Sequence, residues 1–293
     1  MSKFSSADAR RNIIGLNIKR TICYIVLILL AILSVFPFII LIINSTREAS
    51  DITVNFSLLP GKELIKNLKG VFDPGKKDTL PMATGFVNSF IISTAVTVLT
   101  TYFSTITAYA IHAYNFKFKK AAFSFIMLIM MVPTQISAIG FYILMFKFNL
   151  IDTFWPLILP AIAAPTTFFF LKQYMESALP LEIVEAARID GSGEFSTFNK
   201  IVIPMMKPAI AVQAIFAFIG TWNTYFMPAL IINSTPKKTV PILIFQLRSP
   251  SYDENNIALI YTTVFTSVVP LIIVYLLLSK FIIRGIALGS VKG

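Results

Sequence analysis

The chain has 293 residues, of which 56% are hydrophobic and only 13% are charged, and its mean hydropathy is +0.77. These values exclude an ordinary soluble domain and indicate an integral membrane protein. The net charge of +11 does not indicate a nucleic-acid partner, because most basic residues fall in segments that the hydropathy pattern places on one side of the membrane.

Six apolar windows are long enough to cross a hydrocarbon core of about 30 Å as helices. They cover residues 21–43, 84–113, 121–146, 154–174, 204–232 and 258–283. The polar, basic leader before the first window is not followed by a small-residue cleavage site, so we expect this window to be retained as a span. The expected division is a cytoplasmic segment 1–20, the first span 21–43, an extracytoplasmic loop 44–83, a core 84–283 and a cytoplasmic tail 284–293.

The distribution of basic residues predicts the orientation of these spans. With the N-terminus placed inside, fifteen of the 25 Lys and Arg residues lie in cytoplasmic segments, including the short connection NFKFKK at 115–120. The outer segments hold the other ten, diluted by eight acidic residues. By the positive-inside rule both termini are predicted to be cytoplasmic.

The first outer loop and the prolines add detail to this scheme. Loop 44–83 is polar, contains two Pro-Gly pairs and is predicted to form a small lobe outside the membrane. Prolines interrupt the spans, and a membrane tolerates them only where neighbouring groups satisfy the freed carbonyls. Three prolines between residues 156 and 165 predict a bent or discontinuous fourth span; the full set is Pro37, Pro133, Pro156, Pro160, Pro165, Pro228 and Pro270.

Most enzyme chemistry is missing from the sequence. There is no phosphate-binding loop of the G-x-x-x-x-G-K-[ST] type, the single histidine is His112, and the single cysteine, Cys23, allows no internal disulfide. No metal cluster or nucleophile triad is recognisable. The spans are almost free of charge, which disfavours an ion-coupled carrier, although a sodium site made of carbonyls and hydroxyls stays open.

Residues 175–203 form an unusually polar cytoplasmic connection between the fourth and fifth spans. Pro180 suits the first helical position, two glutamates follow it, and Gly191 suits a left-handed stop after Asp190. This predicts a helix of about three turns. A face shared by its apolar residues Ile183, Val184 and Ala187 suits docking on another protein or lying flat on the membrane, and composition does not separate the two. A second short helix is expected over about 194–201, with Pro204 beginning the next span.

The stretch EAARIDGSGEFSTFNKIVIP within this connection resembles the EAA signature of permease subunits in binding-protein-dependent ABC importers. TTFFFLKQYM at 166–175, GTWNTYFMPALI at 220–231 and the C-terminal GIALGSVKG also resemble the MalG-like subunits of the maltose-type sugar importers. The resemblance covers roughly residues 84–293. One departure is Ile203, which stands where the family usually has leucine before the proline.

The resemblance implies an all-α membrane protein with six transmembrane helices in the type I ABC importer permease fold, and a coupling-helix loop at 175–203 that enters a cleft on an ATPase subunit. The implied coupling residues are Glu185, Ala186, Ala187, Asp190, Gly191 and Pro204. The family's tail also approaches the ATPase, which implies contact roles for Gly289, Val291 and Lys292.

The implied assembly contains a second, MalF-like permease, two copies of an ABC ATPase subunit and an extracytoplasmic solute-binding protein in a bacterial cytoplasmic membrane. Nucleic acid has no place in it. The chain itself would be non-catalytic and bind no cofactor or metal, with ATP and Mg²⁺ used by the ATPase partners. The implied cargo is a sugar or oligosaccharide. The alternatives are a glycerol-phosphate importer of the same family, an ion-coupled secondary carrier and, as a third class, a membrane scaffold protein.

The fifth span offers candidate residues for the transport path. Phe218, Trp222 and Tyr225 are spaced to share one helix face, with Asn223 and Thr224 adjacent. Aromatic planes beside amide and hydroxyl groups suit a sugar, whose C–H faces stack and whose hydroxyls hydrogen-bond. The competing interpretation is an aromatic belt or simple packing. Asn88 and Ser89 in the second span are further candidates.

Overall fold

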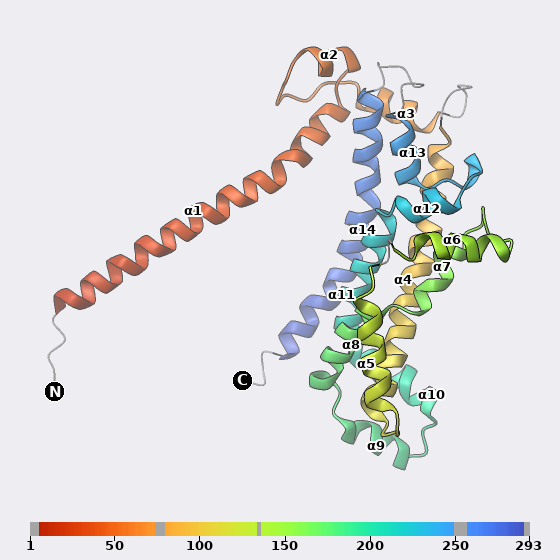
Figure 1. Cartoon of the computed structure of the whole chain (residues 1–293). Coiled ribbons are helices and arrows are strands. Elements are labelled where there is room, and N and C mark those ends of the chain that lie inside the picture. Colours follow the sequence, from red (N-terminus) through yellow and green to blue (C-terminus); the bar gives the residue numbers. More distant parts are fainter. Residues whose placement is uncertain (1–5, 74–79, 134–135, 249–256, 290–293) are drawn as a thin grey trace. The chain divides into compact units, whose positions relative to one another are not determined.

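The computed structural model describes residues 6–73, 80–133, 136–248 and 257–289, and this part of the chain is helical without any strand (Figure 1). The α-helices are α1 (Ser6–Ser45), α2 (Ala49–Val54), α3 (Leu64–Phe72), α4 (Met82–Ala113), α5 (Lys119–Met130), α6 (Ala138–Lys147), α7 (Trp155–Ile158), α8 (Pro165–Ala178), α9 (Leu181–Ile189), α10 (Glu194–Thr197), α11 (Ile203–Trp222), α12 (Phe226–Ile231), α13 (Val240–Gln246) and α14 (Ile257–Gly289). The fold class predicted from the sequence, all-α with the architecture of a type I ABC importer permease, is confirmed.

The chain divides into two compact units. One comprises residues 1–71 and 253–265, and the other comprises residues 72–252 and 266–293. In the first unit, the buried Arg47 side chain donates to the carbonyls of Asp51 and Asn55, both at 2.9 Å. The Asn67 amide donates to the carbonyls of Ser45 and Arg47 at 3.0 and 2.9 Å. These bonds gather α2 and α3 into a small lobe after α1, as expected for loop 44–83.

Helix α4 is the centre of the second unit, where it packs against α8 and α11. Its buried residues are mostly small or hydroxyl-bearing, which lets neighbouring helices approach closely; they include Ser89, Ser93, Thr100, Thr101, Ser104, Thr105 and Ala108. The core of this unit is therefore built around a small-residue face.

The prolines of the fourth span break it into α7, a 3-10 turn at Leu159–Ile162 and α8, as predicted. Pro165 has no N–H to offer the carbonyl of Ala161 four residues earlier. The Thr100 hydroxyl of α4 donates to that carbonyl at 3.1 Å, and the Ser104 hydroxyl donates to the Ala164 carbonyl at 3.3 Å. Neighbouring hydroxyls thus satisfy carbonyls at the break, as a membrane environment requires.

Five helical segments in the described residues are long and apolar enough to cross a membrane: Lys19–Ser45, Met82–Ala113, Trp155–Ala178, Glu194–Trp222 and Ile257–Ile282. The prediction of one continuous third span over 121–146 is wrong. That stretch forms α5 and α6, which are separated around Pro133, and α6 turns away from the direction of α5 (Figure 1). Twelve residues of α5 rise only about 18 Å, less than a hydrocarbon core.

The predicted fifth span, 204–232, also differs from the structure. The helical segment begins ten residues earlier, at Glu194, and α11 ends at Trp222. Helix α12 follows as a separate element. Pro228 cannot donate a backbone hydrogen bond to the Thr224 carbonyl, so a regular helix cannot continue through residues 224–228 without losing that bond.

Candidate functional site

Helix α9 occupies the polar connection singled out in the sequence, at the end of the second unit that α10 shares (Figure 1). It begins at Leu181. Pro180, which was expected to be the first helical residue, has an extended backbone and is the N-cap residue. It ends at Ile189, with Asp190 as its C-cap residue, and Gly191 follows with φ +80°. The Gly191 N–H donates to the Arg188 carbonyl at 3.0 Å and the Ser192 N–H to the Ala187 carbonyl at 2.9 Å. This is a Schellman stop, so the predicted left-handed position of Gly191 is confirmed.

Helix α9 has one buried face and one exposed face. Val184 and Ala187 are buried, and Val184 joins the cluster formed by the inner ends of α4, α8 and α11. Ile183 was expected on the same face, but it is 37% exposed, because neighbouring residues lie about 100° apart around a helix. The predicted coupling residue Ala187 therefore faces its own subunit. Glu185, Ala186 and Asp190 face outward.

A carboxylate just after the turn ties α9 to α4. Glu194 Oε1 accepts from Arg188 Nε at 2.7 Å, and Oε2 accepts from the hydroxyl of Tyr109 at 3.1 Å and from that of Tyr114. The Arg188 guanidinium also lies 5.2 Å from the centre of the Tyr114 ring. We call Glu194, Arg188, Tyr109 and Tyr114 the Glu194 cluster.

The electrostatics of the Glu194 cluster favour the ionised pair. The hydrogen bond to Glu194 raises the pKa of Arg188, and desolvation followed by the bond to Glu194 raises the pKa of Tyr114. Both groups therefore stay protonated donors over the physiological range. Sequence reasoning missed this cluster: opposite charges six residues apart across Gly191 were visible, but the two tyrosine partners lie 80 or more residues away.

The expected second helix, 194–201, is not a separate element. Helix α10 runs through a π-helical turn, Phe198–Val202, directly into α11. Pro204 has no N–H to donate to the Lys200 carbonyl, which is consistent with a π turn immediately before it. Pro204 thus stands inside a continuous helical segment instead of beginning it. Phe198 and Val202 of the π turn are buried in the same cluster as Val184, so α9 and the segment leading into α11 share one core.

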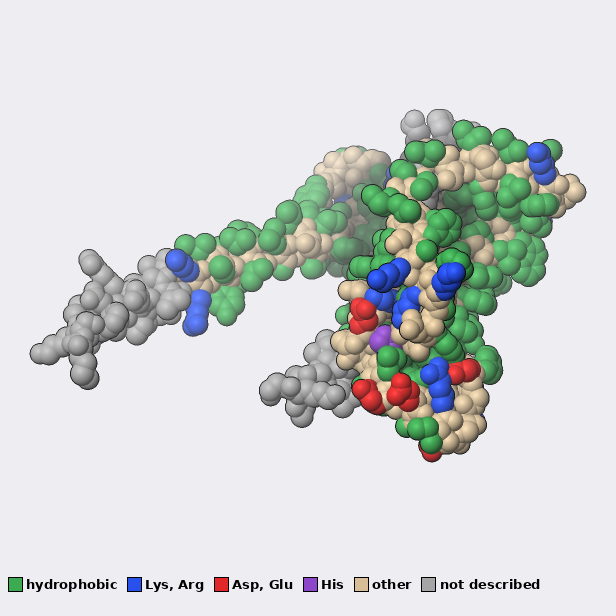
Figure 2. Space-filling model, turned by 60° about the horizontal axis from the view of Figure 1, so that its bottom comes forward, with side chains coloured by type: hydrophobic (Ala, Val, Ile, Leu, Met, Phe, Trp, Pro, Cys, Tyr) green, Lys and Arg blue, Asp and Glu red, His purple; other side chains and the backbone are tan. Residues whose placement is uncertain are grey.

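Two large apolar side chains are exposed around this turn. Ile189 is 87% and Phe195 is 72% exposed, beside outward-facing acidic residues of α9. Figure 2, which brings this end of the second unit forward, shows acidic, basic and hydrophobic side chains gathered there. Of the predicted tail contacts, Val291 and Lys292 lie outside the described residues, and Gly289 ends α14 in a stretch whose side chains are not described.

The aromatic face predicted for the fifth span is a packing cluster. Phe218 and Trp222 are 3% and 2% exposed, and their rings stack at 5.8 Å. Trp222 Nε1 donates to the Ser267 carbonyl at 3.1 Å. Helix α11 stops at Trp222, before the third position of the expected face, so Tyr225 lies beyond its end. The centre of the Tyr225 ring lies 4.9 Å from that of Phe245. The three rings therefore do not share one helix face.

The polar candidates have different surroundings. Asn88 donates to the carbonyls of Pro236 and Lys238 at 2.8 and 3.0 Å, and the Ser89 hydroxyl accepts from the Val240 N–H at 2.9 Å. Both side chains thereby anchor the segment before α13. Asn223 is exposed, and the Thr224 hydroxyl donates to the Gly220 carbonyl at 2.7 Å.

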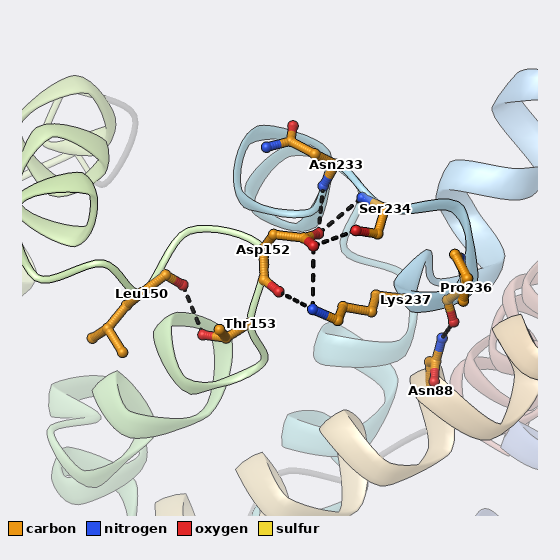
Figure 3. A network of polar contacts seen from close by, with 8 residues as sticks. All are labelled: Asn88, Leu150, Asp152, Thr153, Asn233, Ser234, Pro236 and Lys237. Atoms are coloured by element: carbon orange, nitrogen blue, oxygen red, sulfur yellow. Dashed lines mark hydrogen bonds and ion pairs between the residues drawn. The ribbon is translucent and has the colours of Figure 1, made fainter.

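A second carboxylate cluster joins the turn before α7 to the segment between α12 and α13 (Figure 3). Asp152 has φ +61°, and its carboxylate accepts from the N–H groups of Asn233 and Ser234, both at 2.9 Å, and from the Ser234 hydroxyl. Lys237 Nζ donates to the Asp152 carbonyl at 2.6 Å and lies 3.2 Å from its carboxylate. These bonds, led by the Ser234 hydroxyl, hold the pKa of Asp152 well below its usual range. We call this group the Asp152 clamp.

Comparison with known proteins gives consistent similarities. Residues 101–287 match the family described as binding-protein-dependent transport system inner membrane component. The arabinooligosaccharides transport system permease protein AraQ of Halalkalibacterium halodurans is 34% identical over 278 residues, covering 90% of this chain and 93% of that protein. The lactose transport system permease protein LacG of Rhizobium radiobacter is 30% identical, with 92% and 95% covered.

Two further similarities extend the comparison. The sn-glycerol-3-phosphate transport system permease protein UgpE of Yersinia pestis is 29% identical, with 90% of this chain and 94% of that protein covered. A chain in the crystal structure of a bacterial ABC transporter that imports the acidic polysaccharide alginate has the same fold, with a TM-score of 0.73 at 20% identity, and the match covers 96% of this chain and 99% of that one.

Proposed function

The chain belongs to the family of inner membrane components of binding-protein-dependent transport systems, and on this premise we propose that it is the permease subunit of an ATP-driven importer of a sugar or oligosaccharide. Relatives of similar length carry the names of arabinooligosaccharide and lactose transport proteins, which supports a carbohydrate cargo. The subunit does not hydrolyse ATP, and ATP and Mg²⁺ bind to its ATPase partners.

The observation that carries this function is the construction of the loop that contains α9. One face of α9 is packed into the membrane helices through Val184, and the other presents Glu185 and Ala186 beside the exposed Ile189. Ile189 lies between two membrane-spanning segments and, together with Phe195, offers exposed apolar surface that suits a protein partner. We assign the ATPase subunit to this face, with α9 as the coupling helix.

The Glu194 cluster gives this helix a mechanical connection. A displacement of α9 acts on Arg188 and Glu194, and through them on the two tyrosines at the end of α4. The same displacement acts on α11 through the buried Val184 and Phe198. Closure of two ATPase copies would in this way move α4 and α11 of the permease.

The rest of the assembly follows from the same proposal. A second, MalF-like permease completes the path, a solute-binding protein delivers the cargo from outside, and both termini of this chain lie in the cytoplasm. Residues 84–283 then form the permease core. The tail, including Gly289, Val291 and Lys292, approaches the ATPase. Pro204 belongs to the coupling segment because it follows the π turn that leads from α10 into α11.

The test is uptake by the complete complex in proteoliposomes. With a neighbouring permease, the ATPase and the binding protein present, we expect uptake of arabinan oligosaccharides or lactose that requires ATP inside the vesicle. Uptake driven by a sodium or proton gradient without ATP would contradict the proposal. Purification of the chain as a homodimer free of any ATPase would contradict it as well.

A glycerol-phosphate importer is the second candidate, because UgpE is similar over nearly the whole chain. The two cargoes differ by a charge, so competition separates them. An excess of sn-glycerol 3-phosphate would inhibit sugar uptake if the phosphate ester were the cargo. It would also be taken up itself in an ATP-dependent way.

A further inference from the structure

The small lobe that follows α1 carries an exposed apolar loop. The stretch TVNFSLLP at residues 53–60 contains no charged residue, whereas charged residues precede and follow it. We call Val54, Phe56, Leu58 and Leu59 the apolar tip; their exposed fractions are 77%, 75%, 55% and 76%. Single exposed apolar side chains are ordinary on a protein surface, but four within six residues form a patch that indicates an interaction.

Hydrogen bonds hold both ends of this loop against the end of α1 (Figure 1). At one end the buried Arg47 side chain donates to the Asn55 carbonyl at 2.9 Å. At the other end the Gly61 N–H donates to the Thr46 hydroxyl at 2.7 Å. A Cβ at residue 61 would lie 2.4 Å from the Thr46 carbonyl oxygen, so only glycine allows this close approach. The apolar tip is therefore exposed on a loop that is fixed at both ends.

These anchors also place the loop at the membrane surface. The apolar span of α1, Lys19–Ser45, has 27 residues and rises about 40 Å, close to the thickness of a bilayer with its headgroups. Thr46 therefore lies in the headgroup layer. The five residues between Asn55 and Gly61 are tied at both ends, so the loop extends at most about three residues, or 10 Å, from its anchors. Acyl chains lie within that reach.

We propose that the apolar tip inserts into the bilayer beside the end of α1 and anchors the lobe on the membrane surface. There its side chains exchange water for acyl chains, which is favourable in proportion to the apolar area removed from water. The nearest charged residues in the sequence, Asp51 before the tip and Lys62 after it, are exposed and suit the headgroup layer. Apolar side chains between charged flanks are typical of segments that lie in the membrane interface.

The bilayer is favoured over a protein as the occupant. Lipid lies beside the lobe because α1 crosses the membrane, whereas a protein partner would have to displace headgroups to cover a tip held this close to them. The inference rests on the span of α1 and on contacts within the lobe, and not on the proposed function. Under the proposed topology the leaflet concerned is the outer one.

The test measures the depth of the apolar tip in the complete complex in lipid nanodiscs. Cys23→Ser combined with Phe56→Cys places a single thiol in this chain, and the cysteines of the other subunits are replaced. A fluorescent label on this thiol is quenched either by nitroxides at known carbons of the lipid acyl chains or by iodide in the water. Leu59→Cys provides a second position, because both side chains are at least 75% exposed and their replacement removes little packing. Asp51→Cys, at an exposed polar residue of the same lobe, is the matched control.

We expect the labels at positions 56 and 59 to lie about 5–10 Å below the boundary between headgroups and acyl chains, protected from iodide. The label at position 51 should be quenched by iodide and not by the lipid nitroxides. Leu58→Asp should move the label at position 56 toward water, because an ionised carboxylate is costly to bury. Ser50→Asp, which adds the same charge to the lobe outside the tip, should leave the depth unchanged.

Three results would overturn the proposal. Quenching by iodide alone at positions 56 and 59 would place the tip in water. Protection from both quenchers would show that a protein, such as the second permease or the solute-binding protein, covers the tip. Equal quenching by lipid at positions 51 and 56 would show that the label enters the bilayer by itself.

The measurement needs neither ATP nor sugar, so its failure is distinct from a failure of the proposed function. A complex that imports sugar with the tip in water would remove the membrane anchor and leave the importer. Insertion of the tip in a complex without ATP-dependent sugar uptake would keep the anchor and remove the proposed cargo.

Discussion

At the residue scale, Gly191 is defined by its backbone alone. With φ +80° it adopts a conformation that L-residues disfavour, yet no atom lies within 4 Å of the position a Cβ would take. A substitution therefore strains the chain without a clash. Its cost is about 1–2 kcal/mol, concentrated at the end of α9.

The first prediction is that Gly191→Val lowers transport much more than membrane abundance. Fraying of the Schellman stop should disturb the coupling face, whereas the membrane helices stay intact. The readouts are uptake and ATP hydrolysis in proteoliposomes, normalised to inserted protein. Gly193→Ala is the matched control, since Gly193 has equally open surroundings and an ordinary φ of −67°. Normal uptake by Gly191→Val would remove α9 as the coupling element.

The second prediction concerns Glu194. Glu194→Gln keeps the shape of the side chain but loses the charge that holds Arg188, so α9 should be held less firmly against α4. We expect fewer sugar molecules imported per ATP hydrolysed, by a factor of a few, with near-normal assembly. Glu182→Gln serves as the control, because Glu182 is an exposed carboxylate on α9. An unchanged ratio of transport to hydrolysis in Glu194→Gln would make the cluster merely structural.

At the scale of the elements, α11 is held to its neighbours by buried aromatic rings. Trp222 contacts Phe218 and Phe86 and bonds to the Ser267 carbonyl in α14. Such contacts fix the end of α11. The contacts of Trp222 therefore stabilise the packing of α11 against α4 and α14.

The third prediction is that Trp222→Ala destabilises the complex and leaves the KM for uptake unchanged in the protein that assembles. Removing a buried tryptophan costs about 3–5 kcal/mol through lost contacts and the cavity left behind. The thermal unfolding midpoint and the uptake kinetics are measured together, with Tyr225→Phe as the control for an exposed ring. A raised KM with normal thermal stability would restore these residues to the transport path.

The Asp152 clamp joins the turn before α7 to the segment between α12 and α13, and its strength depends on pH. The folded pKa of Asp152 is lowered relative to about 3.9 in an unfolded chain. The clamp therefore contributes its full stability above about pH 4 and loses it as the pH falls through the lowered folded value.

The fourth prediction follows from that sign. Asp152→Asn should lower the thermal midpoint of the complex at pH 7, and the difference from the unmodified protein should begin to shrink only below about pH 4. Thermal scans between pH 3 and 7 measure it, with Asp51→Asn, a change at an exposed helix residue, as the control. A difference that already vanishes at pH 5 would show that the clamp does not hold an ionised Asp152.

At the scale of the whole molecule, the orientation in the membrane is the fifth prediction. Reporter fusions at residues 117 and 190 and at the C-terminus should report cytoplasm, and fusions near 65, 150 and 245 should report the outside. The reason is the excess of Lys and Arg in the first set of segments. In this topology α5 and α6 together make the sixth crossing, beside the five long apolar helices of the described residues. A cytoplasmic signal from loop 44–83 would contradict it.

The sequence by itself determined the membrane class and the position of α9, because these depend on local patterns; the permease fold was implied by the resemblance of its motifs to a known family. Long apolar windows must be buried in lipid, and Gly191 after Asp190 marks a left-handed stop at any helix end. The broken fourth span was predictable for the same reason, since a proline lacks its N–H in every context.

Only the tertiary structure decided which side chains face a partner and which face the core. Spacing placed Phe218, Trp222 and Tyr225 on one helix, but α11 stops at Trp222, and the packed neighbours of the first two rings come from distant segments. The Glu194 cluster and the bond between Ser89 and Val240 likewise join residues that lie 80 and 151 positions apart. Such groups are brought together by helix packing, and a single sequence contains no local signal for the neighbour that a folded chain will supply.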